Sequence, residues 1–346
     1  MTVKVLLRTP NWIGDAVLAL PAVTALAERP EVRLTVLASP AVHPVFAGLP
    51  SARLSPVDPR ARTPLRAWTV GRALAGDDEI GIVLPASFSS ALVMRLAGVP
   101  RRVGRAADGR SSLLTEALPR RPAPPVPLRG PAQYEPRFHR WRDYAELVEH
   151  VLGSAVPERY PLRVPDRGAA RAARLLDELR GAGPVVGLNP GANGPARRWP
   201  AKRFVELGRA LREAANARVV VLGGPAEVDL GRRVAAGIPG ASSFAGRTSL
   251  ETLLGVLDAL DLFVTNDTGP MHLAAALGTP LLDLCGAADE RVTGPRSPRA
   301  RVLREHLFCS PCVRNACPFD LECMRALAVR RVLEASLLGL QRGRAA

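Results

Sequence analysis

The sequence predicts an α/β protein with two doubly wound domains, each a parallel sheet covered by helices on both faces. Short apolar runs rich in valine and leucine alternate with longer helical patterns along the chain. Such alternation is typical of strands joined by helical crossovers, which produce a parallel sheet. Prolines at Pro157, Pro161 and Pro165 interrupt the pattern near the middle, and 346 residues suffice for two separate cores. We therefore expect one domain at 1–160 and another at 161–346.

The elements of the first half follow from its apolar runs and periodic segments. We predict strands at 3–7, 34–38 and 80–85, and helices at 16–27, 65–75, 89–97 and 141–152. Prolines and arginines dominate residues 119–136, which predicts a long loop rather than a domain boundary.

The second half repeats the alternation with more regular spacing. We predict strands at 184–188, 218–222, 260–265 and 280–284, and helices at 169–179, 201–213, 228–236, 250–259 and 271–277. A last helix at 325–340 could pack back on the first domain. In sheets of this kind, ligands bind outside the carboxyl ends of the strands.

The charge of the chain favours an anionic partner. Lysine and arginine number 47 against 32 acidic residues, a net charge of +15. Nucleic acid, an anionic membrane surface and a phosphorylated substrate would each fit this surplus. Aromatic residues make up only 4%, which argues against stacking platforms for single-stranded nucleic acid. No apolar run approaches the ~18 residues of a membrane span, and the N-terminus lacks a signal-peptide layout. The sequence predicts a cytoplasmic protein.

Three turns that follow predicted strands in the second half have the chemistry of a phosphate and ribose site. In one of them, Asp267, Thr268 and Gly269 open the helix at 271–277, where capping and free backbone N–H groups would suit a phosphate. An ordinary capped helix is the alternative. His272 lies one helical turn further on.

The other two turns add positive charge and a carboxylate. Residues 189–200 contain Asn189 and Gly191, which permit a close backbone approach, and the pair Arg197 and Arg198, which could grip phosphate oxygens. Glu227, in the turn at 222–227, could bind ribose hydroxyls or simply favour a helix N-terminus.

These passages resemble glycosyltransferase family 9, the heptosyltransferases. The second half contributes N-P-G-A-N-G-P-A-R-R-W-P, G-G-P-A-E and T-N-D-T-G-P-M-H-L-A-A-A-L-G-T-P. Residues 10–22, P-N-W-I-G-D-A-V-L-A-L-P-A, and residues 85–104 are similar to the lipopolysaccharide heptosyltransferase II branch of that family. The resemblance runs from residue 3 to about residue 340. It implies a GT-B fold, ADP-L-glycero-D-manno-heptose as donor, and lipid A-linked inner-core oligosaccharide as acceptor.

The resemblance also implies roles for individual residues. Thr268 and Gly269 would hold the donor diphosphate, with Asp267 shaping the loop and His272 supporting it. Glu227 would bind the adenosine ribose. Arg197 stands where the family pattern usually has lysine, and residues 284–290 depart from the usual G-P-T-D.

Asp15 is the candidate general base of the implied inverting transfer. It follows the first predicted strand, and its carboxylate could take the proton of the attacking hydroxyl. The alternative is that Asp15 only caps a helix beginning at Ala16. Asn11, Trp12 and Ser87 are candidates on the acceptor side.

A basic surface in the first domain could meet the acceptor or the membrane. Arg101, Arg102, Arg105, Arg120 and Arg121 flank its loops, where they could contact a phosphorylated acceptor or the inner face of the inner membrane, and ordinary solvated surface is the alternative.

Four of the five cysteines lie close together in the sequence. Cys309, Cys312, Cys317 and Cys323 have spacing that would suit structural zinc or an iron–sulfur cluster, although free thiols and disulfides remain alternatives. The transfer itself requires no cofactor, because helix N-termini and arginines could stabilise departing ADP. Cys285 is predicted to lie in the core.

Two other function classes fit less well. A polyanion- or nucleic-acid-binding α/β protein would explain the charge, but no motif of such proteins is present, and we expect no nucleic-acid partner. A dinucleotide-dependent oxidoreductase would need G-x-G-x-x-G after the first strand, where Pro10–Gly14 stands instead. Within family 9, a different sugar or acceptor remains an alternative.

Overall fold

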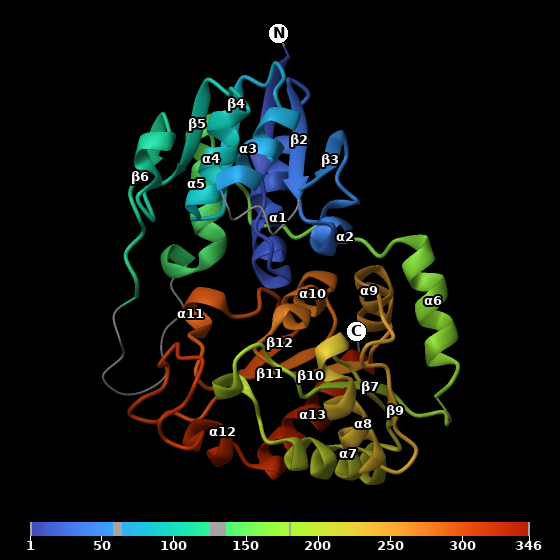
Figure 1. Ribbon diagram of the computed structural model, residues 1–346. Helices are drawn as coiled ribbons and strands as arrows, with labels where there is room; N and C mark the ends of the chain where they lie inside the picture. Colours follow the sequence, from blue (N-terminus) through green and yellow to red (C-terminus); the bar gives the residue numbers. More distant parts are fainter. Residues whose placement is uncertain (1, 58–63, 125–135, 180, 345–346) are drawn as a thin grey trace. The chain divides into compact units, whose positions relative to one another are not determined.

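The computed structural model describes residues 2–57, 64–124, 136–179 and 181–344, and these form two compact units (Figure 1). The first unit contains the described residues up to Ala123 together with Pro136–Arg163, and Val164 begins the main part of the second. The sequence placed this boundary between residues 160 and 161. Most of the loop predicted at 119–136 lies outside the described residues.

The first unit is built on a six-stranded parallel sheet with the order β3-β2-β1-β4-β5-β6. Its strands are β1 (Val3–Arg8), β2 (Val32–Ala38), β3 (Ala52–Pro56), β4 (Ile80–Val83), β5 (Arg101–Arg105) and β6 (Glu116–Leu118). Its helices are α1 (Ile13–Ala27), α2 (His43–Phe46), α3 (Pro64–Ala73), α4 (Phe88–Leu96) and α5 (Arg140–Leu152). The strand order reverses between β1 and β4, so the loops after these two strands mark the topological switch point.

Helix α1 is apolar on all sides because it is enclosed. Every residue from Ala16 to Ala27 is buried, and α1 packs against α5 and β2. A helix without a polar face is stable in water only when other elements surround it. Elsewhere in the first unit, α3 packs against α4, and α4 contacts the strands β4 and β5.

The second unit repeats the topology, with the strand order β12-β11-β10-β7-β8-β9 and all pairs parallel. Its strands are β7 (Val185–Asn189), β8 (Arg218–Val221), β9 (Ser242–Ser243), β10 (Leu262–Asn266), β11 (Leu281–Leu284) and β12 (Ala300–Leu303). Its helices are α6 (Asp166–Leu176), α7 (Ala201–Ala215), α8 (Val228–Ala236), α9 (Leu250–Asp258), α10 (Gly269–Leu277), α11 (Glu290–Thr293), α12 (Glu322–Ala326) and α13 (Val329–Arg344). Here the switch point lies between β7 and β10.

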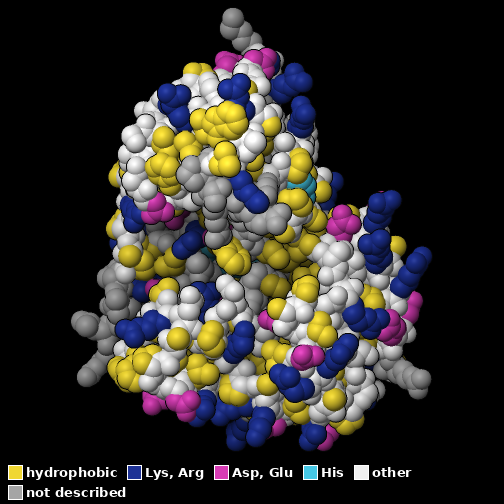
Figure 2. Space-filling view, viewed as in Figure 1, with side chains coloured by type: hydrophobic (Ala, Val, Ile, Leu, Met, Phe, Trp, Pro, Cys, Tyr) yellow, Lys and Arg dark blue, Asp and Glu magenta, His cyan; other side chains and the backbone are white. Residues whose placement is uncertain are grey.

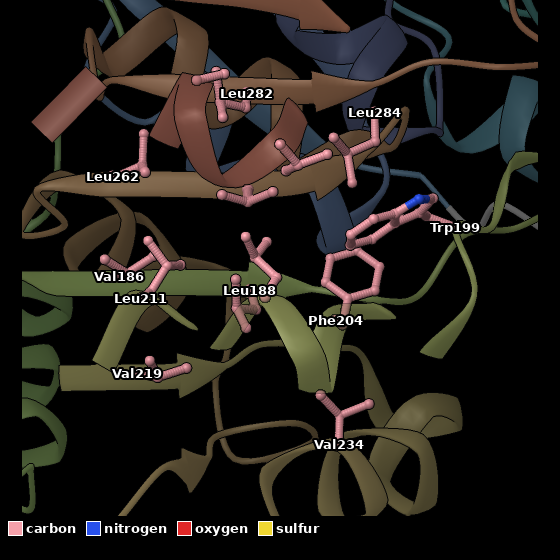
Figure 3. Close-up of a cluster of buried hydrophobic side chains, with 14 of the residues drawn as sticks. Val186, Leu188, Trp199, Phe204, Leu211, Val219, Val234, Leu262, Leu282 and Leu284 are labelled. Atoms are coloured by element: carbon pink, nitrogen blue, oxygen red, sulfur yellow. The ribbon is translucent and has the colours of Figure 1, made fainter. Parts of the chain in front are cut away.

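The core of the second unit connects its sheet to α7 and α13. Figure 3 shows Trp199 beside Phe204, whose ring centroids lie 5.0 Å apart in an edge-to-face arrangement, close to side chains from β7, β10 and β11. Helices α6 and α9 pack closely at Gly168 of α6. A Cβ added at this position would lie 2.2 Å from the backbone oxygen of Glu251 in α9, so the close packing depends on glycine.

The C-terminal helix differs from its prediction. The predicted helix at 325–340 is two helices, α12 and α13. Its expected packing on the first domain stays a prediction. Val332, Ala335 and Leu340 of α13 are buried in the core of the second unit, against α7, β10 and β11. The apolar stripe of this helix is therefore used within its own unit.

The sequence patterns identified the central strands and missed β3, β5, β6, β9 and β12. Four of these are edge strands and β5 lies next to the edge strand β6, and each is only two to five residues long. Several carry arginine or serine, so they lack the continuous apolar run of a strand buried on both faces. None of the helices in the described ranges is both long and apolar enough to cross a membrane.

Candidate active site

The first unit has a cavity of about 930 Å³ at its switch point. Asn11, Trp12 and Asp15 reach it from the chain after β1, Ser87 from the loop after β4, and Tyr144 from α5. The four residues assigned to the acceptor side and to the base are thus neighbours in the fold. Trp12 is 62% exposed, which leaves its ring free to contact a ligand.

The Asp15 side chain accepts hydrogen bonds from residues of α5 and does not cap a helix. Helix α1 begins at Ile13, so Asp15 lies within its first turn, and Trp12 occupies the N-cap position without a side-chain bond. The Tyr144 hydroxyl donates to Oδ1 of Asp15 at 3.1 Å, and Nη1 of Arg140 donates to the same oxygen at 3.4 Å. Because this partly exposed carboxylate faces the cavity, its geometry suits a base better than a helix cap.

Arginines give the cavity a cationic wall. Its lining includes Arg8, Arg105, Arg120, Arg121 and Arg140. Burial lowers the pKa of Arg8 to about 10, and its guanidinium donates to Oδ1 of Asn11 at 2.6 Å, which orients that amide. Dark blue basic side chains are also spread over the face of the molecule in Figure 2.

Two of the five arginines predicted to flank these loops have other roles. Arg101 forms an ion pair with Glu116, at 2.7 Å between Nε and Oε1, and this lowers the pKa of Glu116 to about 2. Arg102 donates to the backbone oxygens of Val99 and Leu113 at 2.6 and 2.8 Å. Both stabilise β5 and the loops beside it.

The loops after β7 and β10 meet at the switch point of the second unit. Nδ2 of Asn189 donates to the hydroxyl oxygens of Thr265 and Thr268 at 3.0 and 3.2 Å. Thr268 is the N-cap residue of α10, but its side chain makes no capping bond. Asp267 does not cap the helix either, because its carboxylate pairs with Arg197 at 3.2 Å. The predicted side-chain capping is therefore wrong, which leaves backbone N–H groups at the start of α10 available to an anion.

The two arginines of the first loop differ in their contacts. Arg197 is partly exposed and neutralises Asp267. Nε and Nη2 of Arg198 both donate to the backbone oxygen of Ala192, at 3.0 and 2.8 Å. Arg198 thus stabilises the loop, whereas Arg197 carries its charge beside Asp267 and Thr268.

Gly191 and Glu227 are adjacent. A Cβ added to Gly191 would lie 1.7 Å from Oε1 of Glu227, so a larger residue here would displace that carboxylate. Oε2 of Glu227 accepts a bond of 2.8 Å from the backbone N–H of Gly224. This contact supports the helix-start interpretation of Glu227 and places its carboxylate next to the loop after β7.

Asn266 connects the two loops, and the sequence interpretation missed it. Nδ2 donates to the backbone oxygens of Pro190 and Gly191 at 2.9 and 3.2 Å, and Oδ1 accepts from the backbone N–H of Trp199 at 2.9 Å. The signal that could have revealed this residue is an asparagine at the end of a strand that is otherwise mostly apolar. His272, by contrast, is buried in α10, within the helix that carries the anion site.

Acidic side chains lie buried beneath this site. Burial raises the pKa of Asp267, and the positive charge of Arg197 partly offsets the rise. Burial raises the pKa of Asp283 well above its ordinary value, and the neighbouring Asp267 adds to the effect. Asp283 is the single charge in β11, which the sequence interpretation also passed over.

The segment that departs from the family pattern is held by Arg304. Its Nη1 donates to the backbone oxygen of Gly286 at 3.3 Å and to Oγ of Ser310 at 2.9 Å. Its Nη2 donates to Sγ of Cys285 at 3.0 Å and forms an ion pair with Glu290. Cys285 is buried, as predicted.

The four clustered cysteines line a second, smaller cavity of about 310 Å³. All are unpaired, and Sγ of Cys317 accepts bonds from the backbone N–H groups of Phe319 and Leu321, both at 3.3 Å. Within the ranges that the structure describes, no three His, Cys, Asp or Glu side chains are arranged to hold a metal ion.

Comparisons with known proteins agree with these features. The model of glycosyltransferase family 9 (heptosyltransferase) matches residues 67–322. Lipopolysaccharide heptosyltransferase 2 of Salmonella typhimurium is 27% identical over 334 residues, covering 87% of this chain and 88% of the relative.

Solved structures show the same architecture. E. coli ADP-heptose lipopolysaccharide heptosyltransferase II superposes with a TM-score of 0.77 at 25% identity, covering 99% of this chain and all of that one. E. coli heptosyltransferase WaaC with ADP has a TM-score of 0.72 at 21% identity, covering 97% of this chain and all of that one. The two sheets therefore form a GT-B fold. Since the family model covers most of the chain, the protein is a glycosyltransferase and belongs to glycosyltransferase family 9, the heptosyltransferase family.

Proposed function

We propose that this glycosyltransferase transfers a heptose from ADP-L-glycero-D-manno-heptose to the heptose of the lipopolysaccharide inner core, with inversion at the anomeric carbon. The near full-length similarity to heptosyltransferase 2 proteins supports this substrate pair. The observation that carries the proposal is the carboxylate of Asp15, which faces a large cationic cavity at a sheet switch point.

Asp15 acts as the general base. The acceptor hydroxyl oxygen forms a bond to the anomeric carbon while the bond from that carbon to the diphosphate oxygen breaks. The hydroxyl proton passes to Asp15, and the electron pair of the broken bond stays on ADP. A carboxylate suffices because the hydroxyl becomes more acidic as its oxygen bonds to carbon.

The second unit binds the donor and stabilises its leaving group. Backbone N–H groups at the start of α10 and the guanidinium of Arg197 hold the diphosphate. Negative charge that develops on departing ADP is stabilised there by fixed dipoles and one cation, so the chemistry needs no metal. Glu227, whose carboxylate lies against Gly191, binds the ribose.

The cavity of the first unit binds the acceptor. Exposed aromatic rings of Trp12 and Phe88 beside several guanidinium groups suit a glycan that carries acidic substituents. Because the acceptor is attached to lipid A, the enzyme works at the inner face of the inner membrane, where its net charge of +15 favours an anionic surface.

A transfer assay tests the proposal. The full chain is incubated with ADP-heptose and a truncated Kdo-bearing lipid A that carries one heptose, with and without EDTA. We expect release of ADP and a product heavier by one heptose, in both conditions. ADP release only with an acceptor that lacks the first heptose would contradict the proposed acceptor, and no release with any core acceptor would contradict the function.

Arg197→Gln tests the donor side. Loss of this charge is expected to lower kcat/KM for the donor by about 10- to 100-fold, the usual range for a hydrogen bond to a charged group. Arg198→Gln is the matched control, with a smaller expected loss because that guanidinium is bound to the backbone of Ala192. Steady-state kinetics over a donor titration measure both. Equal losses in the two variants would contradict the assignment of Arg197.

A further inference from the structure

Asp15 receives both of its side-chain hydrogen bonds on one oxygen. The hydroxyl of Tyr144 and Nη1 of Arg140 both donate to Oδ1. Among the described residues, no donor is hydrogen-bonded to Oδ2. The carboxylate is thus held on one side, while its other oxygen stays free beside the cavity of the first unit.

The two donors come from one face of α5. Arg140 and Tyr144 are four residues apart, so they lie on adjacent turns of the same helix face. Helix α5 packs against α1, which carries Asp15 in its first turn. The packing of the two helices therefore sets the position of the carboxylate, although the residues are 129 and 125 positions apart in the sequence.

Tyr144 is suited to orient the carboxylate without losing its own proton. Its side chain is buried, and burial together with the negative charge of Asp15 raises its pKa well above the ordinary value. The hydroxyl therefore remains a donor at any pH at which the enzyme works.

Other charged groups around the cavity have partners of their own. Arg105 and Arg121 form ion pairs with Glu146, and Nε of Arg121 lies 3.5 Å from Oδ1 of Asp143. Arg8 is directed to Asn11 and to the backbone oxygens of Thr9 and Leu37. Among the described side chains, Tyr144 and Arg140 are the hydrogen-bond donors to Asp15.

We propose that Tyr144 is a positioning residue for the base: it occupies Oδ1 of Asp15, with Arg140 as a weaker second donor, so that Oδ2 receives the acceptor proton. This inference rests on the proposed role of Asp15. The Tyr144 hydroxyl touches no reacting atom, and its bond fixes the rotamer of the carboxylate. On this arrangement, the proton transfer forms an O–H bond at Oδ2 and leaves the bond from Tyr144 to Oδ1 in place.

Tyr144→Phe in the full-length enzyme tests the proposal. We expect kcat to fall by about 10- to 100-fold, as for loss of a hydrogen bond to a charged group, with the affinity for ADP unchanged. The loss should fall on kcat rather than on KM for the acceptor, because the bond from Tyr144 positions the base. Arg140→Gln should lower kcat by less, and it provides a second test if Tyr144→Phe does not fold.

Tyr160→Phe is the matched control. Its hydroxyl donates to Oε1 of Glu158 at 3.3 Å, away from the residues that line the cavity. The control should keep the kcat and the acceptor KM of the wild type, even if it lowers the melting temperature.

A double variant separates failure of this inference from failure of the proposed base. In the Asp15→Asn background, adding Tyr144→Phe should cause no further loss of turnover, since the two residues act as one unit. A wild-type kcat in Tyr144→Phe, or fully additive losses in the double variant, would overturn the positioning role alone. Full turnover in Asp15→Asn would overturn it together with the role of Asp15.

Discussion

Asp15→Asn is expected to lower kcat by about 10²- to 10⁴-fold, the range typical of a lost general base, and to leave the affinity for ADP unchanged. The substitution keeps the size of the side chain but removes its ability to accept the hydroxyl proton. The donor residues lie on the second unit, so donor binding should not depend on this group. Single-turnover transfer and calorimetric titration with ADP measure the two quantities.

Asp143→Asn provides the matched control for this experiment. Asp143 is the other aspartate that lines the same cavity, but its carboxylate lies beside Arg105 and Arg121. Its loss should change turnover far less. If Asp15→Asn kept the wild-type rate and Asp143→Asn lost most of it, the general base would be Asp143 rather than Asp15.

Trp199→Ala is expected to have the largest effect on stability, lowering the free energy of unfolding of the second unit by about 3–5 kcal/mol. The side chain is 1% exposed, packs on Phe204, and donates from Nε1 to the backbone oxygen of Leu327 at 3.0 Å. Its removal leaves a cavity and takes away one of the two donors to that oxygen, the other being Nη1 of Arg203 at 2.7 Å. Denaturant unfolding followed by far-ultraviolet circular dichroism measures the change.

Trp12→Ala is the contrasting variant. This tryptophan is 62% exposed at the cavity of the first unit, so its loss should change stability by no more than about 0.5 kcal/mol. It should instead raise KM for the acceptor. A destabilisation by Trp12→Ala as large as that by Trp199→Ala would show that the core assignment is wrong.

Trp199 also connects the hydrophobic core of the second unit to the candidate site of that unit. Its backbone N–H donates to Asn266, which in turn donates to the backbone of Pro190 and Gly191. The loop after β7 is therefore attached to the hydrophobic core. We expect Trp199→Ala to weaken ADP binding as well, which the same titration measures.

Much of the candidate site in the second unit could be predicted because its signals are local. Each of the turns at 189–200, 222–227 and 265–272 follows a strand and precedes a helix, and parallel strands bring such turns to one edge of the sheet. The hydrogen bonds from Asn189 to Thr265 and Thr268 confirm that two of these turns meet. The resemblance to family 9 was confirmed by the family model.

Other features could not be predicted because they depend on contacts between distant segments. Nothing in the pattern of α5 indicates that Tyr144 and Arg140 bind Asp15, since an amphipathic helix shows which face is buried but not against what. The pairing of Asp267 with Arg197, in place of helix capping, is likewise decided by two loops 70 residues apart. The polar strand β5 forms because β4 and β6 pair with it on both sides.

The sequence by itself determined the two-domain α/β architecture, the central strands and the chemical character of each turn, because hydrophobic periodicity and backbone-permissive residues act over a few positions. Only the tertiary structure decided which oxygen of Asp15 is free, which arginine faces Asp267, and where the last helix packs. These depend on how helices and loops far apart in the chain are brought together, and the free energy of that packing is not encoded in any short segment.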